Sequence, residues 1–288
     1  MTDTQFVLIL VLPLLVFLVA LVAYPLGYSF WLSLHDVNIF VGVFKYVGFG
    51  QYARVLSDPL LLTSIVVTVR FAFESTIISV FVALATALLL NERIPGRGVL
   101  RTAVLLPWTI SAYATAMLWK FLLSSQFGFY NGILYMLGLT SSYIEFFDKG
   151  LVIETLATIF SWRVAPLSAF FLLAGMQTVP EDLYKSAKID GAGPFRRFWH
   201  ITLPHIRYSM LIVIVLNTML AAKELDTIFI GSSGGPAGAS KVLAYYAYER
   251  TFAEMNAGFG AAISYVLMFI MLAITTTYFI LLSRRRAA

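Results

Sequence analysis

Charged side chains inside apolar segments are the residues whose types and spacing could do chemistry here. Six of them fall within or near long apolar runs: Arg70, Glu74, Lys120, Arg163, Lys223 and Glu224. A charge at the centre of a bilayer costs roughly 2.5–3.5 kcal/mol on insertion scales, so such residues usually face a partner or a watery cavity. Arg70 and Glu74 are four residues apart, which predicts an ion pair on one helical face. Lys120 is close to the end of its run, where its amine can reach the interface.

Arg163 and Glu224 have surroundings that allow two interpretations. The stretch Trp162-Arg-Val-Ala-Pro166 combines an aromatic ring, a hydrogen-bonding group and a residue that kinks helices. Asn217, Leu220, Ala221 and Glu224 recur at three- and four-residue intervals, which predicts one helical face. The sequence leaves open a structural Arg–Glu pair between helices and a polar lining of a solute pathway.

Several kinds of chemistry are not expected. The chain has no cysteine, which excludes disulfides and thiolate sites, and the spacing of its three histidines, His35, His200 and His205, predicts no metal site. The glycine-rich stretch 231–238 lacks the Gly-Lys-Ser/Thr ending of a phosphate-binding loop. The net charge of +5 comes from Lys and Arg clustered in short loops, which is not a nucleic-acid pattern.

The elements that must position these residues are membrane helices. The 288 residues are 60% hydrophobic and only 12% charged, whereas a soluble domain carries about 25% charged residues. A spanning helix needs roughly 20 mainly apolar residues. We therefore expect an all-α membrane protein, one transmembrane domain over 1–288, with six spans near 6–34, 60–90, 99–123, 151–178, 208–230 and 257–283.

The basic residues predict the orientation, because cytoplasmic loops carry the excess of Lys and Arg. Six spans place both termini on one side of the cell membrane. That side holds the larger set, Arg93, Arg97, Arg101, Lys185, Lys188, Arg196, Arg197, Arg207, Arg284, Arg285 and Arg286, and the other holds Lys45, Arg54, Lys149, Lys241 and Arg250. Both termini and the loop 178–204 are thus expected in the cytoplasm.

The loop 178–204 predicts two short helices. Thr178 is a candidate cap with Glu181 three residues later, and Pro180 suits a first turn. Gly191 can take the left-handed conformation that ends a helix. A second helix follows with Phe195, Phe198, Trp199 and Thr202 on one face, ended by Leu203-Pro204. We expect that aromatic face to pack on the chain's own membrane domain.

Two parts of this loop carry a resemblance to a known family. Tyr184-Lys-Ser-Ala-Lys-Ile-Asp-Gly-Ala192, followed by Ile201-Thr-Leu-Pro204, resembles the EAA loop of permease subunits of binding-protein-dependent ABC importers. Tyr24–Leu34, Arg101–Trp108 and Gly234-Gly-Pro236 resemble other segments of the maltose-type carbohydrate branch, similar to the first of its two permeases. The resemblance implies a type I ABC importer permease fold with a coupling-helix loop. It implies ATPase docking by Glu181, Asp182, Tyr184, Lys185, Ser186, Ala187, Asp190, Gly191 and Ala192.

One departure from the family pattern concerns that docking. Lys185, followed by Ser186, stands where the family usually has the glutamate of Glu-Ala-Ala. That glutamate typically pairs with a basic group of the ATPase, so Lys185 would reverse the contact. Asp190, Glu181 and Asp182 are the candidate replacements.

The resemblance also places candidate sugar contacts. They are the positions Ala112, Phe160, Arg163, Val164, Leu167, Leu220, Ala221 and Glu224, to which helical spacing adds Asn217. The side chains mostly differ from the maltose pattern, so a sugar is implied, as a di- or oligosaccharide, without maltose specificity.

The implied partners follow from what one chain of this kind lacks. They are a second homologous permease, two ATPase subunits that bind ATP and Mg²⁺, an extracytoplasmic solute-binding protein, the sugar and membrane lipid, with no nucleic acid. The chain itself is expected to be no enzyme and to hold no cofactor or metal. An ion- or proton-coupled secondary transporter is the alternative, but Glu74 and Glu224 each have a basic candidate nearby. That alternative also leaves the Gly191 loop unexplained.

Overall fold

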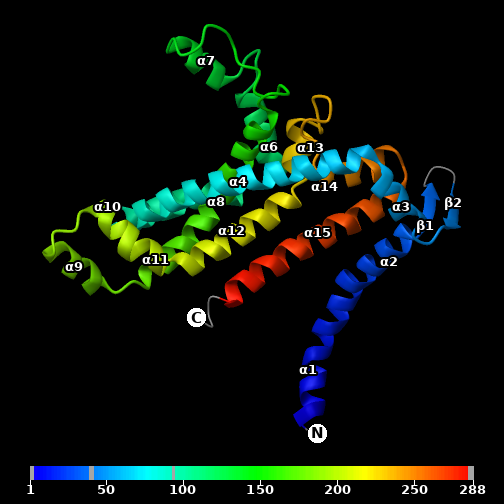
Figure 1. Cartoon of the computed structure of the whole chain (residues 1–288), viewed down its shortest axis with the longest axis horizontal. Coiled ribbons are helices and arrows are strands. Elements are labelled where there is room, and N and C mark those ends of the chain that lie inside the picture. The colour runs from blue at the N-terminus through cyan, green and yellow to red at the C-terminus, as the bar shows by residue number, and fades with distance from the viewer. Residues whose placement is uncertain (1–2, 39–41, 93–94, 285–288) are drawn as a thin grey trace. The chain divides into compact units, whose positions relative to one another are not determined.

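The computed structural model describes residues 3–38, 42–92 and 95–284 (Figure 1). Arg93, Arg285 and Arg286, on which the expected orientation partly rests, lie outside the described residues. The chain divides into two compact units, Met1–Thr63 with Tyr246–Ile270, and Ser64–Tyr245 with Met271–Ala288.

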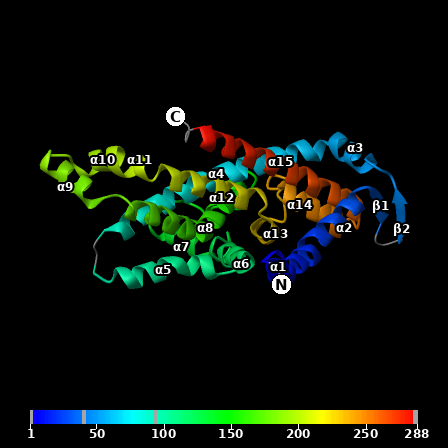
Figure 2. The same cartoon turned by 90° about the horizontal axis from the view of Figure 1, so that it is seen from below.

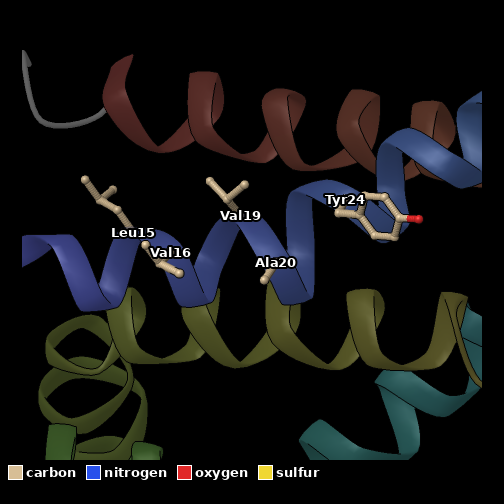
Figure 3. A pocket seen from close by; sticks show the side chains of 5 residues that line it. All are labelled: Leu15, Val16, Val19, Ala20 and Tyr24. Carbon is tan, nitrogen blue, oxygen red and sulfur yellow. The ribbon is translucent and has the colours of Figure 1, made fainter.

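The first unit begins with a long apolar helical segment. Helix α1 (Asp3–Leu18), the π-helical turn η1 (Val19–Ala23) and α2 (Tyr24–Ser33) follow one another directly. The span candidate Leu10–Ser33 has a mean hydropathy of 2.5, and its apolar window holds no buried side chain. Leu15, Val16, Val19, Ala20 and Tyr24 line a shallow apolar hollow along it (Figure 3). Such a surface fits lipid or another membrane protein.

The rest of the first unit contains a small hairpin and several short helical pieces. Strands β1 (His35–Asn38) and β2 (Val43–Tyr46) pair antiparallel, with Asp36 opposite Lys45. Helix α3 (Gly50–Ser57) precedes α4 (Pro59–Asn91), and the second segment holds the end of α14 (Leu243–Tyr248), the π-helical turn η3 (Glu249–Ala253) and the start of α15 (Ala257–Arg284). Gly258 is required here, because a Cβ would lie 2.1 Å from the His35 carbonyl oxygen.

The second unit is built around α4, α8 (Val152–Gln177) and α12 (Arg207–Ala222). It also holds α5 (Arg97–Thr109), α6 (Ala112–Leu122), α7 (Phe129–Met136), α9 (Glu181–Ile189), α10 (Pro194–Arg197), η2 (Phe198–Thr202), α11 (Leu203–His205) and α13 (Asp226–Gly231). Both views place α9 to α11 together at one end of α8 and α12 (Figures 1 and 2). In Figure 1, α7 projects away from α4, α8 and α12.

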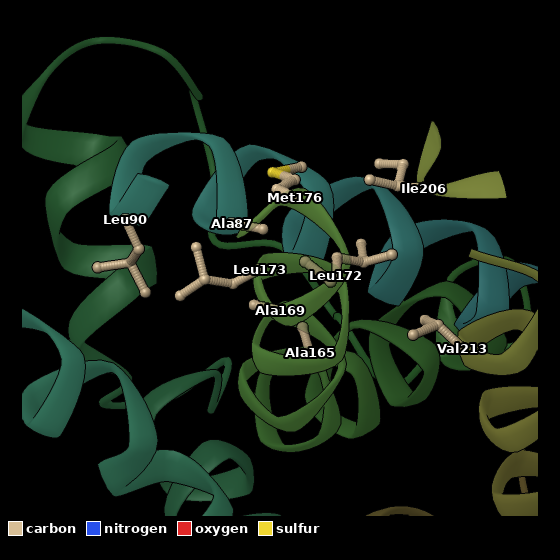
Figure 4. Close-up of a cluster of buried hydrophobic side chains, with 10 residues drawn as sticks. Ala87, Leu90, Ala165, Ala169, Leu172, Leu173, Met176, Ile206 and Val213 are labelled. Carbon is tan, nitrogen blue, oxygen red and sulfur yellow. The ribbon is translucent and has the colours of Figure 1, made fainter. Parts of the chain in front are cut away.

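Small side chains let these three helices approach closely. Ala83, Ala87, Ala165 and Ala169 belong to a buried cluster with larger neighbours, Leu90, Leu172, Leu173, Met176, Ile206 and Val213 (Figure 4). A Cβ on Gly175 would lie 2.4 Å from Ser209 Oγ, so only glycine permits this approach of α8 and α12. Ser161 Oγ also donates to the Ser75 carbonyl at 3.0 Å between α8 and α4. Small residues joined by hydroxyl bonds are typical of helix contacts in membranes.

The candidate spans agree with the expected ones in part. Four helices are long and apolar enough to cross a membrane, Leu10–Ser33, Pro59–Asn91, Val152–Gln177 and Ala257–Tyr278, or up to six if two bent pairs in the described part of the chain each count as one span. The first pair, α5 and α6, bends by 94°. A single helix over 99–123 is therefore wrong. Ile110 is extended, and Ser111 accepts from Ala114 N at 3.2 Å to start α6.

The fifth expected span is also interrupted. Instead of one helix over 208–230, α12 ends at Ala222 and α13 begins at Asp226. The second bent pair joins Pro194–His205 to α12 at 70°. Glu224 lies in the break between α12 and α13. The loop 178–204 meets α12 at the other break, between His205 and Arg207.

Candidate functional site

The Arg163–Glu224 pair forms the polar centre of the second unit. Arg163 Nη2 lies 3.4 Å from Glu224 Oε2, and the two side chains are 16% and 9% exposed. The guanidinium carbon also lies 5.7 Å from the centre of the Phe160 ring. Of the two interpretations that the sequence leaves open, the structure contains the Arg–Glu pair between helices. It joins α8 to the segment between α12 and α13.

Glu224 does more than balance Arg163. Its Oε1 accepts hydrogen bonds from Thr227 N at 3.1 Å and Thr227 Oγ1 at 2.6 Å. The carboxylate thus caps the first turn of α13, whose free N–H groups favour a negative charge. The prediction that Glu224 continues the helical face of Asn217 is wrong, because the helix has ended by then.

The other candidate contacts fall into two groups. Phe160 and Val164 of α8, and Asn217 and Ala221 of α12, are fully or almost fully buried within the unit. Ser168 Oγ donates to Asn217 Oδ1 at 3.0 Å, while the Asn217 Nδ2 atom has no partner in the described residues. Partly exposed are Arg163, Ala112, Leu167 and Leu220. The second group is therefore partly accessible at the surface of the unit, whereas the first group is not.

Sequence reasoning missed an aromatic cluster beside this site. The Trp119 ring of α6 stacks on Tyr130 of α7 with centres 5.4 Å apart, and its edge meets Trp162 of α8 at 5.7 Å. The cluster thus links α6, α7 and α8, and Trp162 is the residue before Arg163. The sequence shows that these aromatic residues are present, but it does not indicate that they are in contact, because they are far apart along the chain.

Three more of these membrane charges, Arg70, Glu74 and Lys120, have partners. Arg70 Nε donates to Glu74 at 2.8 Å, which confirms the predicted pair, and Arg70 also bonds Glu154 of α8. Lys120 Nζ donates to the Ile230 carbonyl oxygen at 2.9 Å, near the end of α13. A cation at a helix C-terminus is favourable. The exposed Lys120 amine therefore has a stabilising partner within the protein.

The loop 178–204 begins with the expected helix and turn. Gly191 has a φ of +75°, and Ala192 N donates to the Ala187 carbonyl at 2.8 Å, which closes the end of α9. The predicted cap is wrong, since Pro180 is the residue before α9. Thr178 Oγ1 instead donates back to the Gly175 carbonyl at 2.8 Å.

The second helix of this loop runs one residue further than expected. It passes through the π-helical turn η2 and includes Pro204, and it ends at His205. The expected stop at Leu203-Pro204 before the fifth span is thus right to within one residue, since a bend of 70° separates this helix from α12.

The loop exposes its apolar side chains. Ile189 is 87% exposed, Phe195 76% and Trp199 50%, so the expectation that this aromatic face packs on the membrane domain is wrong for Phe195 and Trp199. The two helices are held by a hydrogen bond of 2.9 Å between Tyr184 Oη and Thr202 Oγ1. Lys185 Nζ donates to Asp182 at 2.8 Å, with both side chains exposed. The docking candidates thus lie together on an accessible surface.

A second polar cluster lies in the first unit and was not predicted. Asp58 accepts from the hydroxyl of Tyr246 and from Arg250 Nη2, the latter at 3.2 Å, and Arg250 also pairs with Glu254. Partial burial alone would raise the pKa of Asp58, but the Tyr246, Leu60 and Arg250 bonds together lower it from its ordinary 3.8. Burial, followed by the bond to Asp58, raises the pKa of Tyr246 to about 12.

Over the described part of the chain, no group of three or more His, Cys, Asp or Glu side chains could hold a metal ion.

Comparison with known proteins identifies the family. Residues 3–288 match the family described as "Binding-protein-dependent transport system inner membrane component". The chain belongs to this family. It is 34% identical to the trehalose/maltose transport system permease protein MalF of Thermococcus litoralis over 94% of this chain and 91% of that protein.

A second relative supports the assignment, and a solved structure is similar in fold. The trehalose transport system permease protein SugA of Mycobacterium tuberculosis is 31% identical over 97% of this chain and 89% of its own length. The crystal structure of a bacterial ABC transporter for import of the acidic polysaccharide alginate contains a chain that matches with a TM-score of 0.81. The match covers 98% of this chain and 96% of that one at 21% identity, which establishes likeness of fold. The resemblance found in the loop around Gly191 is confirmed at the level of the family.

Proposed function

We propose that this chain is the permease subunit of an ATP-driven ABC importer that moves a di- or oligosaccharide into the cytoplasm. The observation that carries the proposal is the helix–turn–helix unit of residues 178–204. It lies at one end of α8 and α12, the two helices that lead to Arg163 and Glu224 (Figure 1). Relatives at 34% and 31% identity transport trehalose or maltose by name, which supports a sugar as the solute.

The arrangement in the membrane is part of the proposal. Each bent pair counts as one span, which gives six, with both termini and the loop 178–204 in the cytoplasm. The chain then acts as one transmembrane domain over 1–288. A second homologous permease supplies the other half, and an extracytoplasmic solute-binding protein delivers the sugar. Two separate ATPase subunits bind ATP and Mg²⁺, so this chain is no enzyme.

Coupling follows from how the loop is joined to the helices. A subunit that binds the exposed apolar side chains Ile189 and Phe195 would move α9 to α11 as one piece, because the Tyr184–Thr202 bond joins their two helices. One end of this piece leads into α8 and the other into α12. Displacing it therefore tilts α8 against α12, the step that alternating access requires.

The charge at position 185 of the docking loop is opposite to that of the glutamate usual in the family. Lys185 already pairs with Asp182 on its own helix, and both are largely exposed. We expect the ATPase groove to present an acidic group to Lys185, with Glu181, Asp182 and Asp190 at its edge. The docking surface includes the Tyr184, Ser186, Ala187, Gly191 and Ala192 positions.

The pathway would use the partly exposed side chains first. Arg163 offers donors for sugar hydroxyls, while Ala112, Leu167 and Leu220 offer apolar surface for C–H faces. Phe160, Val164, Asn217, Ala221 and Glu224 form the layer behind them and become accessible only if α8 and α12 separate.

Energised uptake tests the function directly. Membrane vesicles that contain the assembled transporter and its binding protein are given radiolabelled trehalose and, separately, maltose. Uptake should stop when ATP is depleted and persist when an uncoupler removes the proton gradient while ATP is maintained. Loss of uptake with the uncoupler alone would indicate an ion- or proton-coupled secondary transporter instead.

A further inference from the structure

The chain between α6 and α8 forms a hairpin, and residues 121–143 of it have an apolar surface that the proposed pathway and loop do not use. In helix α7 at its centre, Phe129 is 62% exposed, Met136 86% and Leu137 67%. With Ile133, these residues follow the spacing of one helical face. Phe127 and Leu139 extend the same apolar surface beyond the two ends of the helix, each more than 60% exposed.

On the opposite side of α7, Asn131 is polar and buried. Asn131 Nδ2 donates to the Ser124 carbonyl at 3.1 Å and the Ile144 carbonyl at 3.0 Å, and its Oδ1 accepts from Ile144 N at 2.8 Å. Gly128 closes the root of the hairpin, because a Cβ there would lie 2.3 Å from the Ser124 carbonyl oxygen. The hairpin therefore holds its shape through polar contacts inside, which leaves its apolar side chains outward.

The composition of the hairpin resembles the centre of a protein interface. No charged residue occurs between Lys120 and Glu145. Interface centres are depleted of charge and enriched in aromatic residues and methionine. Lipid also accepts apolar side chains, but the chain from residue 138 to 151 follows α7 with little regular structure. Lipid-exposed irregular backbone does not occur in the hydrocarbon region.

The position of the hairpin indicates which protein covers it. Tyr130 stacks on Trp119, and Trp119 contacts Trp162, the residue before Arg163. The two helices that the hairpin joins, α6 and α8, both carry candidate pathway residues. In a transporter built of two halves, the pathway side of one half faces the other half. The root of α7 thus lies on the side where the second permease must sit.

We propose that the apolar face of the α7 hairpin is a contact surface for the second permease subunit, which meets it with an uncharged, apolar surface of its own. This inference rests on the proposed function, because it needs a second membrane half. The hairpin would hold the two halves together at the outer end of the pathway.

The absence of native cysteine allows a direct test. Met136→Cys and the matched control Lys149→Cys, an exposed position outside the apolar surface, are each made in the full chain. Each is examined in membranes with the whole transporter and in membranes with this chain alone, without binding protein. A membrane-impermeant charged maleimide is added from outside. The Met136→Cys thiol should react at least tenfold more slowly in the whole transporter than in the chain alone, while Lys149→Cys reacts in both.

The other occupants give different results, each of which overturns the inference. Lipid would protect the Met136→Cys thiol in both membranes, and open water would leave it reactive in both. A photoreactive p-benzoylphenylalanine at position 136 adds a measurement that does not require the lone chain to fold. It should cross-link to the second permease polypeptide in the whole transporter; cross-links to lipid or to the binding protein alone would contradict the proposal. If no second membrane polypeptide purifies with the tagged chain, the proposed function fails. If one does purify and position 136 neither cross-links to it nor is protected, only this inference fails.

Discussion

Tyr184 Oη lies 2.9 Å from Thr202 Oγ1, so a bond between two hydroxyl groups joins the two helices of the 178–204 loop. Thr202 is buried, so the bond has little competition from water. A hydrogen bond of this kind contributes about 1 kcal/mol. This energy is small against the stability of the whole protein, but the bond joins the two helices that the proposed coupling moves together.

Removing this bond should uncouple transport without preventing assembly. Tyr184→Phe and Thr202→Val should each lower the sugar moved per ATP hydrolysed in proteoliposomes, by about two- to fivefold, while the ATPase subunits still copurify. Because both variants break the same bond, the double variant should be little worse than either one. Additive losses would contradict the role of the bond.

Gly191 is the position in this loop where a side chain should be costly. Its φ of +75° is unfavourable for any residue with a Cβ by roughly 1–2 kcal/mol, although the space around it is open. Gly191→Val should therefore abolish or strongly reduce ATP-driven uptake. Gly193→Ala is the matched control, since Gly193 has a φ of −64° and should tolerate alanine. Unchanged uptake by Gly191→Val would contradict the assignment of this turn to coupling.

At the root of the hairpin, Gly128 lies so close to the backbone of residues 122 and 124 that a side chain there should be costly. Gly128→Ala would place a methyl group within 2.7 Å of three backbone atoms of residues 122 and 124. The hairpin must then open, which should lower the thermal stability of the purified transporter by several degrees. Gly132→Ala is the control on the same helix, because an added methyl group there would meet nothing within 4 Å. Equal stability of both variants would show that the hairpin root is not so tightly closed.

Local sequence patterns predict the elements whose cause is local. The span expected at 151–178 agrees with α8 within a residue at each end. A long apolar run can be recognised from its own residues, without knowledge of its neighbours in space. The turn at Gly191 follows from the conformational freedom of glycine. The Arg70–Glu74 pair follows from helical spacing.

Contacts between distant segments are not predictable in this way. Helical spacing places Glu224 on the face of Asn217, but its bond to Thr227 starts a new helix and breaks the pattern. The Trp119–Tyr130 stack and the Asp58–Tyr246 bond depend on how helices pack, and no periodicity in one segment encodes them. The spacing of aromatic residues in the second loop helix favours a buried face, yet Phe195 and Trp199 are exposed. An apolar face alone does not say which partner covers it.

The Asp58 cluster predicts a dependence on pH with two sides. The pKa of Asp58 is lowered in the folded protein. Its contribution to the free energy of unfolding is therefore present above its ordinary pKa of 3.8 and is lost as pH falls through the lower pKa of the folded protein. The pKa of Tyr246 is raised to about 12 in the folded protein. Its contribution to the free energy of unfolding is therefore full below its ordinary pKa of 10 and is lost as pH rises through about 12. Thermal unfolding in detergent should therefore show Tyr246→Phe to be less sensitive than the native chain between pH 10 and 12. Tyr135→Phe, at an exposed position, should keep the native profile; a Tyr246→Phe profile equal to the native one would contradict the coupling.

Glu224 separates a pathway role from a purely structural one. Glu224→Gln keeps an oxygen that can accept from Thr227 but removes the charge opposite Arg163, whereas Glu224→Ala removes both. If the pair lines the pathway, Glu224→Gln should change the KM for sugar uptake severalfold while the ATPase subunits and the thermal stability stay as in the native transporter. Glu74→Gln is the control, because it removes a membrane carboxylate that pairs with Arg70 and not with Arg163. Native uptake kinetics in Glu224→Gln, together with lost stability in Glu224→Ala, would assign Glu224 to the α12–α13 break alone.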